Sequence, residues 1–460
     1  MAINEFRKSY NQQPYKHSFM LSFTKSLVIT ALICFSSFAM AQSRIDFTEF
    51  DLPNGLHVIL HQDNSTPIVA VTISYHVGSK NENPDRTGFA HFFEHLMFEG
   101  SENIPRGQFD KIAMNAGGQI NANTSWDRTF YYILLPSNQL ELGLWMESER
   151  LLHLRIDSTG LETQRRVVKE ERKQSYDNRP YGSLIEKTFS TAYTVHPYRW
   201  TPIGSAQYID EATLDEFIEF HSRFYVPNNA ILSIAGDIDP EQAKVLARKY
   251  FGDIPRGTKE ITRPKIVEPK QTAEVRDTVF DNIQLPAVVQ AYHMPAMGTP
   301  DYYALSMLTT LLSDGESSRL NKSVVDKQQK ALFVGSFPIP LEEPGLFLVF
   351  GIVNMGIDPA DLESAVDAEV KRAQTEELSD REFEKLRNKM ENDFVSRNST
   401  MAGIAESLSD YKMYFGDANL INTEIDKYMK VTKADIMKVA NQYLTKENRI
   451  VLYYLPKQSQ

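Results

Sequence analysis

Cysteine is almost absent from this sequence, since Cys34 is the only one among 460 residues. It lies within an apolar stretch near the N-terminus, so residues 42–460 contain none. Disulfide bonds and thiol chemistry are therefore excluded for that part of the chain. A membrane-spanning run is also lacking, because the apolar stretch 27–35 is short and is followed by Ser36 and Ser37.

The first 41 residues have the composition of a secretory signal peptide. Basic residues precede the apolar stretch, and an A-x-A cleavage site ends at Ala41. We therefore predict that residues 1–41 are a signal peptide, with Met1 or Met20 as the start. Ile33, before the cysteine, does not suit a lipoprotein site, which argues against a stable membrane anchor. We expect an exported protein, most simply in a bacterial periplasm.

Basic residues are outnumbered by acidic ones, at 49 against 60. Without the predicted leader, which holds four basic residues and one acid, the net charge becomes about −14. A surface of this sign repels phosphate backbones and anionic lipid headgroups. We therefore expect neither a nucleic-acid partner nor a polybasic membrane contact.

Residues 88–99 are rich in Phe, Leu and Met, which predicts a buried helix. On a helix, His91 and His95 project from one face, and Glu94 lies at its edge. Two imidazoles and a carboxylate inside apolar packing are unfavourable unless something binds them. The H-x-x-E-H pattern of metallopeptidases places Zn²⁺ on the two histidines and leaves the glutamate to accept a proton from water. The simpler alternative is a pair of helix histidines bonded to neighbouring carbonyl groups.

A zinc site built on two histidines needs a third protein ligand. The predicted helix 158–177 offers Glu170 and Glu171. Glu171 follows Val167 and Val168 at helical spacing, so we expect it to face the core with them. Glu170 is expected to be half-exposed, as a supporting or solvent-facing carboxylate. The alternative is an ordinary charged helix face.

The two halves of the chain show the same order of predicted elements, but only the first half has the histidine pair. We therefore predict an α+β protein of two homologous domains, each a mainly antiparallel sheet packed with helices. The N-terminal zinc domain is residues 42–255, the linker 256–272, and the C-terminal domain without a metal site 273–460. Strand-like segments occur in both halves, at residues 56–60, 68–75, 129–135, 230–236, 285–292, 346–352 and 450–454.

Several segments together carry a family resemblance: Leu52–Leu56, the His91–His95 motif, Gly118–Tyr132, Val167–Glu171, Tyr225–Gly236 and Ser317–Leu320. With these segments the sequence resembles the pitrilysin-type (inverzincin) zinc metallopeptidases, in the group of two-domain subunits related to mitochondrial processing peptidase. The histidine motif is the specific mark, and the other segments support it. The resemblance covers nearly all of residues 42–460.

The resemblance implies one Zn²⁺ per chain, bound by His91, His95 and Glu171, with Glu94 as the catalytic base. It also implies that Asn121 and Ala122 lie on an edge strand that holds the substrate backbone by strand addition. The expected activity is that of a zinc-dependent endopeptidase acting on peptides or unfolded polypeptide segments. Gln164 stands where the family often has a further acid.

The second half departs from the family pattern at two positions. Family members that work alone usually carry an Arg and a Tyr there, whereas this sequence has Val325 and Leu332. The resemblance therefore implies a second pitrilysin-like subunit without a zinc site, with a homodimer as the alternative. Two rival functions remain: a non-catalytic peptide-binding or structural subunit, and a competent chain that is inert without its partner.

Overall fold

The computed structural model describes residues 44–457 of the chain. The predicted signal peptide, residues 1–41, lies outside the described residues. Residues from Asp46 onward belong to one compact unit. Within the part that the structure describes, no helix is both long enough and apolar enough to cross a membrane.

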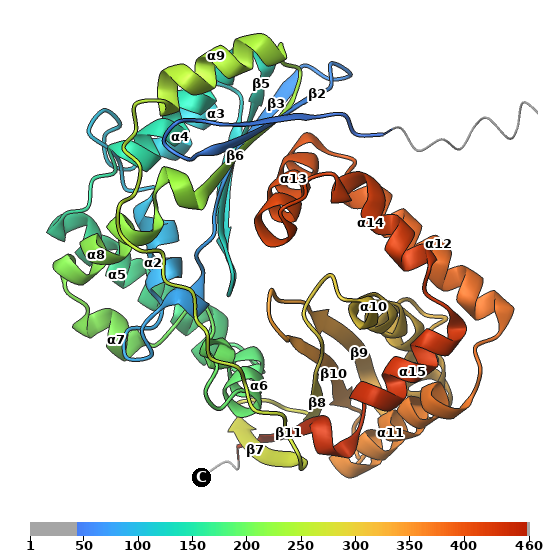
Figure 1. The fold of residues 1–460 in the computed structure, drawn as a ribbon. Helices are drawn as coiled ribbons and strands as arrows, with labels where there is room; N and C mark the ends of the chain where they lie inside the picture. The colour runs from blue at the N-terminus through green and yellow to red at the C-terminus, as the bar shows by residue number, and fades with distance from the viewer. Residues whose placement is uncertain (1–43, 458–460) are drawn as a thin grey trace, which may run out of the picture. The chain divides into compact units, whose positions relative to one another are not determined.

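Six strands form a first sheet in the order β1-β2-β6-β3-β5-β4 (Figure 1). Strands β2 and β6 run parallel, and the other neighbouring pairs are antiparallel. Strand β4 therefore forms one edge of the sheet, with β5 as its neighbour. The strands span Thr48–Asp51 (β1), His57–Gln62 (β2), Ile68–Tyr75 (β3), Gln119–Thr124 (β4), Thr129–Pro136 (β5) and Ala230–Gly236 (β6).

Five strands form a second sheet in the order β7-β11-β8-β10-β9. Its one parallel pair, β7 with β11, stands where β2 and β6 stand in the first sheet, and the remaining pairs are antiparallel. The two sheets thus share one topology, which confirms the prediction of a duplicated α+β fold. The strands span Val275–Asp281 (β7), Ala287–His293 (β8), Ala331–Ile339 (β9), Leu346–Val353 (β10) and Arg449–Pro456 (β11).

Helices α3, α4 and α9 lie on one face of the first sheet (Figure 1). The first half carries Phe89–Leu96 (α2), Phe109–Asn115 (α3), Leu140–Leu152 (α4), Ser158–Arg172 (α5), Leu184–Ala192 (α6), Ala206–Glu211 (α7), Leu214–Phe224 (α8) and Pro240–Phe251 (α9). The second half carries Pro300–Ser313 (α10), Pro359–Thr375 (α11), Asp380–Arg397 (α12), Met401–Phe415 (α13), Leu420–Met429 (α14) and Lys433–Tyr443 (α15).

Each half covers part of the other half's sheet. Helix α6 of the first half packs on β8 and β11, and α13 of the second half packs on β3 and β6. The α6 contact is apolar, because Phe189 is buried with Val289 and Leu348. The face of the first sheet under α13 is more polar, with Thr72 and Ser74 fully buried on it.

A buried ion pair reinforces the contact between the halves. Lys80 Nζ lies 2.8 Å from Asp127 Oδ1 and also contacts Glu342 of the second half. Asp127 accepts hydrogen bonds from the Tyr198 hydroxyl at 2.7 Å and the Glu342 amide at 2.9 Å. Burial alone would raise the pKa of Glu342, but hydrogen bonding from His76 and the nearby charge of Lys80 lower it to about 2.

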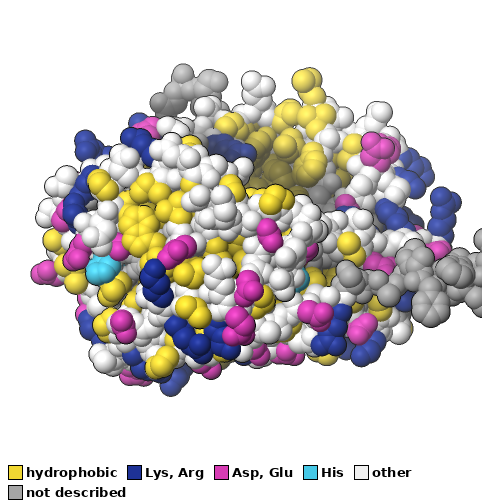
Figure 2. Space-filling model, turned by 90° about the horizontal axis from the view of Figure 1, so that it is seen from above, with side chains coloured by type: hydrophobic (Ala, Val, Ile, Leu, Met, Phe, Trp, Pro, Cys, Tyr) yellow, Lys and Arg dark blue, Asp and Glu magenta, His cyan; other side chains and the backbone are white. Residues whose placement is uncertain are grey.

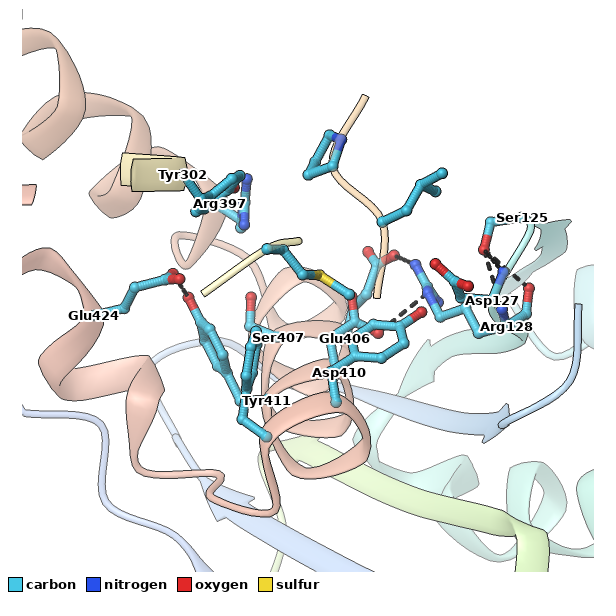
Figure 3. A pocket seen from close by; sticks show the side chains of 15 residues that line it. Ser125, Asp127, Arg128, Tyr302, Arg397, Glu406, Ser407, Asp410, Tyr411 and Glu424 are labelled. Atoms are coloured by element: carbon cyan, nitrogen blue, oxygen red, sulfur yellow. Dashed lines mark hydrogen bonds and ion pairs between the residues drawn. The ribbon is translucent and has the colours of Figure 1, made fainter. Parts of the chain in front are cut away.

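A cavity of about 360 Å³ adjoins this contact, lined by residues of α13, α14 and the turn after β4. Figure 3 shows Arg128 beside Glu406 and Asp410, with Tyr411 donating a hydrogen bond to Glu424. Burial raises the pKa of Asp410 to about 6. These charged groups already pair with one another, so we interpret the cavity as part of the contact between the halves.

Acidic and basic side chains are interspersed over the face seen in Figure 2. The net charge of −11 is therefore not gathered into a single acidic patch on that face.

We expect Lys80→Met to lower the free energy of unfolding by about 3–5 kcal/mol, because it leaves Asp127 buried without its ionic partner. Urea unfolding followed by circular dichroism measures the change. Lys249→Met is the matched control, since Lys249 pairs with Glu141 while 58% of its side chain is exposed, and it should leave the free energy of unfolding nearly unchanged. Equal losses in the free energy of unfolding would show that the buried Lys80–Asp127 pair is no more stabilising than the exposed pair.

Candidate metal centre

The predicted helix of the histidine motif is confirmed as α2. Its buried face carries Phe92 and Phe93, whose rings lie 4.6 and 5.6 Å from the ring of Phe217 in α8. His91 and His95 project from another face and keep 12% and 23% of their side chains exposed. The packing of the phenylalanines therefore sets the direction in which the two imidazoles point.

A buried carboxyl group holds the first turn of α2. Glu82 accepts hydrogen bonds from the backbone amides of Gly88 and Ala90 at 2.9 and 2.8 Å. Burial raises the pKa of Glu82 to about 8, against the opposite effect of these donors. Sequence reasoning missed this residue. The available signal was an acid a few residues ahead of a helix whose N-cap, Gly88, has no side chain to bind the free amides.

The third candidate ligand lies on α5. Asp157 caps this helix by accepting a hydrogen bond from the Gly160 amide at 2.8 Å. Val168 is buried and faces the core, as expected, but Val167 is 44% exposed. The prediction that both valines face the core was therefore wrong for Val167, because 100° of rotation separates consecutive residues. Glu171 shares the side of Val168 and reaches the histidines while 39% exposed.

The three side chains converge at one point. Glu171 Oε2 lies 3.1 Å from His95 Nε2, and Oε1 lies 3.6 Å from His91 Nε2. One ligand atom from each residue falls within 4.8 Å of the others. Hydrogen bonding with His91 and His95 holds the pKa of Glu171 well below its usual range.

This donor set fits zinc in chemistry and in spacing. Zinc binds imidazole nitrogen and carboxylate oxygen with bonds of about 2.0–2.2 Å, so tetrahedral ligand atoms lie about 3.3 Å apart. The two imidazole nitrogens lie 3.1 and 3.6 Å from the two different oxygens of the Glu171 carboxylate, close to that value. Among the residues from 44 to 457, this is the one group of three or more such side chains with ligand atoms close enough to share an ion.

Glu94 lies beside the three converging side chains without belonging to them. Its Oε2 accepts a hydrogen bond from Thr124 Oγ1 of β4 at 2.7 Å. A cleft of about 510 Å³ opens here, and its wall includes His91, Glu94, Glu171, Trp126, Tyr176 and Ile185. The cleft therefore brings the predicted base, two of the predicted ligands and an edge strand together.

The remaining candidate residues occupy different surroundings. Asn121 and Ala122 lie on β4, the edge strand next to the cleft. Glu170 is exposed and accepts a hydrogen bond from Gln174 at 3.0 Å. Gln164, which replaces the family's further acid, donates a hydrogen bond to Glu99 at 2.5 Å.

Two glycines connect the helices that carry the candidate ligands. Arg172, the last residue of α5, donates a hydrogen bond to the carbonyl of Gly204 at 2.6 Å. Gly204 has φ +64°, and a Cβ built on it would lie 2.3 Å from the backbone of Gly88 at the start of α2. Only glycine suits this position, because the backbones approach too closely for any side chain.

Comparison with known proteins identifies the family. Residues 57–202 match the model described as insulinase (peptidase family M16), and residues 211–390 match the model described as the peptidase M16 inactive domain. The chain belongs to peptidase family M16. The pitrilysin-type resemblance inferred from the sequence is thereby confirmed.

Individual members of family M16 resemble this chain over most of its length. Zinc protease PqqE of Helicobacter pylori is 32% identical over 88% of this chain and 92% of its own length. The crystal structure of a protease from Helicobacter pylori has a TM-score of 0.86 at 31% identity, covering 90% of this chain and all of the other. The probable mitochondrial-processing peptidase subunit beta of Schizosaccharomyces pombe is 25% identical over 85% of this chain and 88% of its own length.

We expect Gly204→Ala to weaken zinc binding about 10- to 100-fold, because the added methyl group pushes the start of α2 away from the end of α5. Competition with a chromogenic chelator measures the affinity. Gly107→Ala is the matched control, since Gly107 has φ +67° but no atom within 4 Å of a built Cβ. Both variants share the backbone strain of a left-handed alanine. The same zinc affinity in both would contradict the role assigned to the glycine contact.

Proposed function

We propose that this chain is a zinc-dependent endopeptidase that hydrolyses peptides or unfolded polypeptide segments. The observation that carries the proposal is the convergence of His91, His95 and Glu171 with Glu94 beside them and outside the ligand set. Two imidazoles and one carboxylate are the three protein ligands that would hold a catalytic zinc ion. The relatives named zinc proteases also support the proposed endopeptidase function.

In this mechanism His91 Nε2, His95 Nε2 and one Glu171 oxygen would hold the ion. Zinc bound there supplies a Lewis acid that polarises a carbonyl group and lowers the pKa of water. Glu94 accepts the proton of the attacking water on its free oxygen, Oε1, while Thr124 holds Oε2. Glu94 then delivers the proton to the amine that leaves from the cleaved peptide.

The substrate backbone binds along the open edge of β4 in this proposal, at Asn121 and Ala122. Backbone hydrogen bonding is independent of side chains, which suits an enzyme that accepts many sequences. The cleft of about 510 Å³ has room for a few extended residues rather than a folded domain. Glu170 is proposed to add negative charge on the solvent side of Glu171.

We also propose that the chain works beside a second subunit of the same fold without a zinc site, with a homodimer as the alternative. Val325 and Leu332 stand where the family resemblance expects an Arg and a Tyr, and Leu332 is 56% exposed on β9. One relative is itself named a subunit beta. The proposed location is a bacterial periplasm, reached through a signal peptide at residues 1–41.

The domain limits proposed from the sequence, 42–255 and 273–460 around a linker, place the whole candidate site in the first domain. The match to the inactive-domain model covers residues 211–390. It does not reach His91, His95 or Glu171, so it does not favour the alternative of a non-catalytic peptide-binding or structural subunit.

We expect Glu94→Gln to lower turnover of a quenched fluorescent peptide library by about 10²- to 10⁴-fold without reducing zinc content, because the amide cannot accept the proton. Zinc is measured by mass spectrometry on the purified full chain. Glu162→Gln, at an exposed position of α5 next to Arg165, is the control and should match the wild type. A wild-type chain that binds zinc but cleaves nothing would support the rival functions, and one that binds no zinc would refute the peptidase proposal.

A further inference from the structure

Thr124 is part of the edge strand β4 and also contacts the predicted base, Glu94. It is the last residue of β4, and its half-buried side chain lies on the same face of the strand as Ile120 and Ala122, toward α2. Its Oγ1 donates to Glu94 Oε2 at 2.7 Å, a normal length for a hydroxyl–carboxylate hydrogen bond.

The backbone of Thr124 points toward the open edge of the sheet. The amide of Ser125 donates to the carbonyl of Arg128 at 2.8 Å and closes the β4–β5 hairpin. Hydrogen-bonded and non-hydrogen-bonded pairs alternate along an antiparallel ladder, so in the next pair, Thr124 with Thr129, the amide and carbonyl groups of Thr124 point away from β5 to the open edge. Ala122 follows the same alternation.

The amide of Ala122 confirms this direction, because it donates to Asn121 Oδ1 at 2.9 Å instead of to β5. When no other strand is present, the Asn121 side chain therefore binds this outward amide of β4. A peptide adding to β4 would replace Asn121 at this amide and reach the outward groups of Thr124.

The hairpin turn that follows Thr124 is anchored by a buried ion pair, whereas the Glu94 carboxylate is held by a single hydrogen bond. Asp127 in that turn pairs with Lys80 at 2.8 Å, and both side chains are 3% exposed. Within the described residues, Glu94 has no hydrogen bond other than the one from Thr124. The direction of the Glu94 carboxylate thus depends on where the end of β4 lies.

We propose that Thr124 is a positioning residue that couples peptide binding along β4 to the orientation of Glu94. The inference rests on the proposed peptidase function. A peptide that pairs with the outward groups of Ala122 and Thr124 restrains the unpaired edge of β4 as far as the anchored turn, and the threonine hydroxyl passes that order to the base. Binding energy from residues beyond the scissile bond then raises kcat instead of only lowering KM.

The kinetic test compares wild type, Thr124→Val and Thr124→Ser on quenched peptides that share one cleavage site. One peptide is short, and two others are extended by several residues at either end. In the wild type, the extension that pairs with β4 should raise kcat about 10-fold over that of the short peptide. Thr124→Val should keep the effect of that extension on KM but lose its effect on kcat, with kcat about 10- to 100-fold below wild type. Thr124→Ser, which retains the hydroxyl, should restore most of the gain.

An equal kcat gain in wild type and Thr124→Val would overturn the proposal. A lower zinc content in Thr124→Val than in the other two proteins would also overturn it, because Thr124 would then act on the fold of the site. Failure of Thr124→Ser to restore the kcat gain would assign the effect to the methyl group or to packing, and would overturn the role of the hydroxyl.

Hydrogen exchange gives a readout that does not need turnover, and so separates this inference from the peptidase proposal. The probe is a long peptide with its scissile amide reduced, added to each protein. It should slow exchange at β4 in both wild type and Thr124→Val, and slow exchange around Glu94 in α2 only in the wild type. Equal protection of α2 in both proteins would refute the coupling even if the enzyme cleaves peptides. A clear difference would support it even if no peptide is cleaved.

Discussion

Helices α2 and α5 meet through backbone contacts as well as through side chains. Gly204 lies against Gly88 at the start of α2, and Arg172 at the end of α5 binds the carbonyl of Gly204. Glu82 accepts hydrogen bonds from the first amides of α2. Because these contacts set the distance between the two helices, the imidazoles and the Glu171 carboxylate meet at a separation that suits a metal ion. The proposed zinc binding, and any catalysis built on it, would depend on this spacing.

The duplicated fold uses its two halves differently. Apart from β1, which has no counterpart among the described strands of the second half, both sheets have the same order and pairing of strands, and α10 packs on β9 as α2 packs on β4. Helix α10 carries no histidine, so the second half offers no equivalent of the metal centre. It contributes α13 to the first sheet and receives α6 in return. The second half therefore supports the half that holds the candidate site, and the buried Lys80–Asp127 pair strengthens that contact.

The sequence predicts the fold class, which the structure confirms, and it names the three candidate ligands that the structure brings together, because both follow from local patterns. Helical spacing placed His91 and His95 on one face, and Glu171 was reached from helix position and from family resemblance. Glu82, Thr124 and Gly204 escaped prediction, since each acts on a partner that only the tertiary structure brings near. The exposure of Val167 shows that helical spacing alone does not tell which of two adjacent valines faces the core. The packing of α13 on the other half's sheet likewise has no signal in its own residues.

The measurement that tests this account most directly is an anomalous difference map at the zinc absorption edge, from crystals of the protein grown with zinc. We predict a single strong peak about 2.0–2.2 Å from His91 Nε2, His95 Nε2 and one oxygen of Glu171. Glu94 should lie outside bonding distance of that peak, with its hydrogen bond to Thr124 intact. No peak at this position, or a peak bonded to Glu94 in place of Glu171, would contradict the assignment of ligands and base.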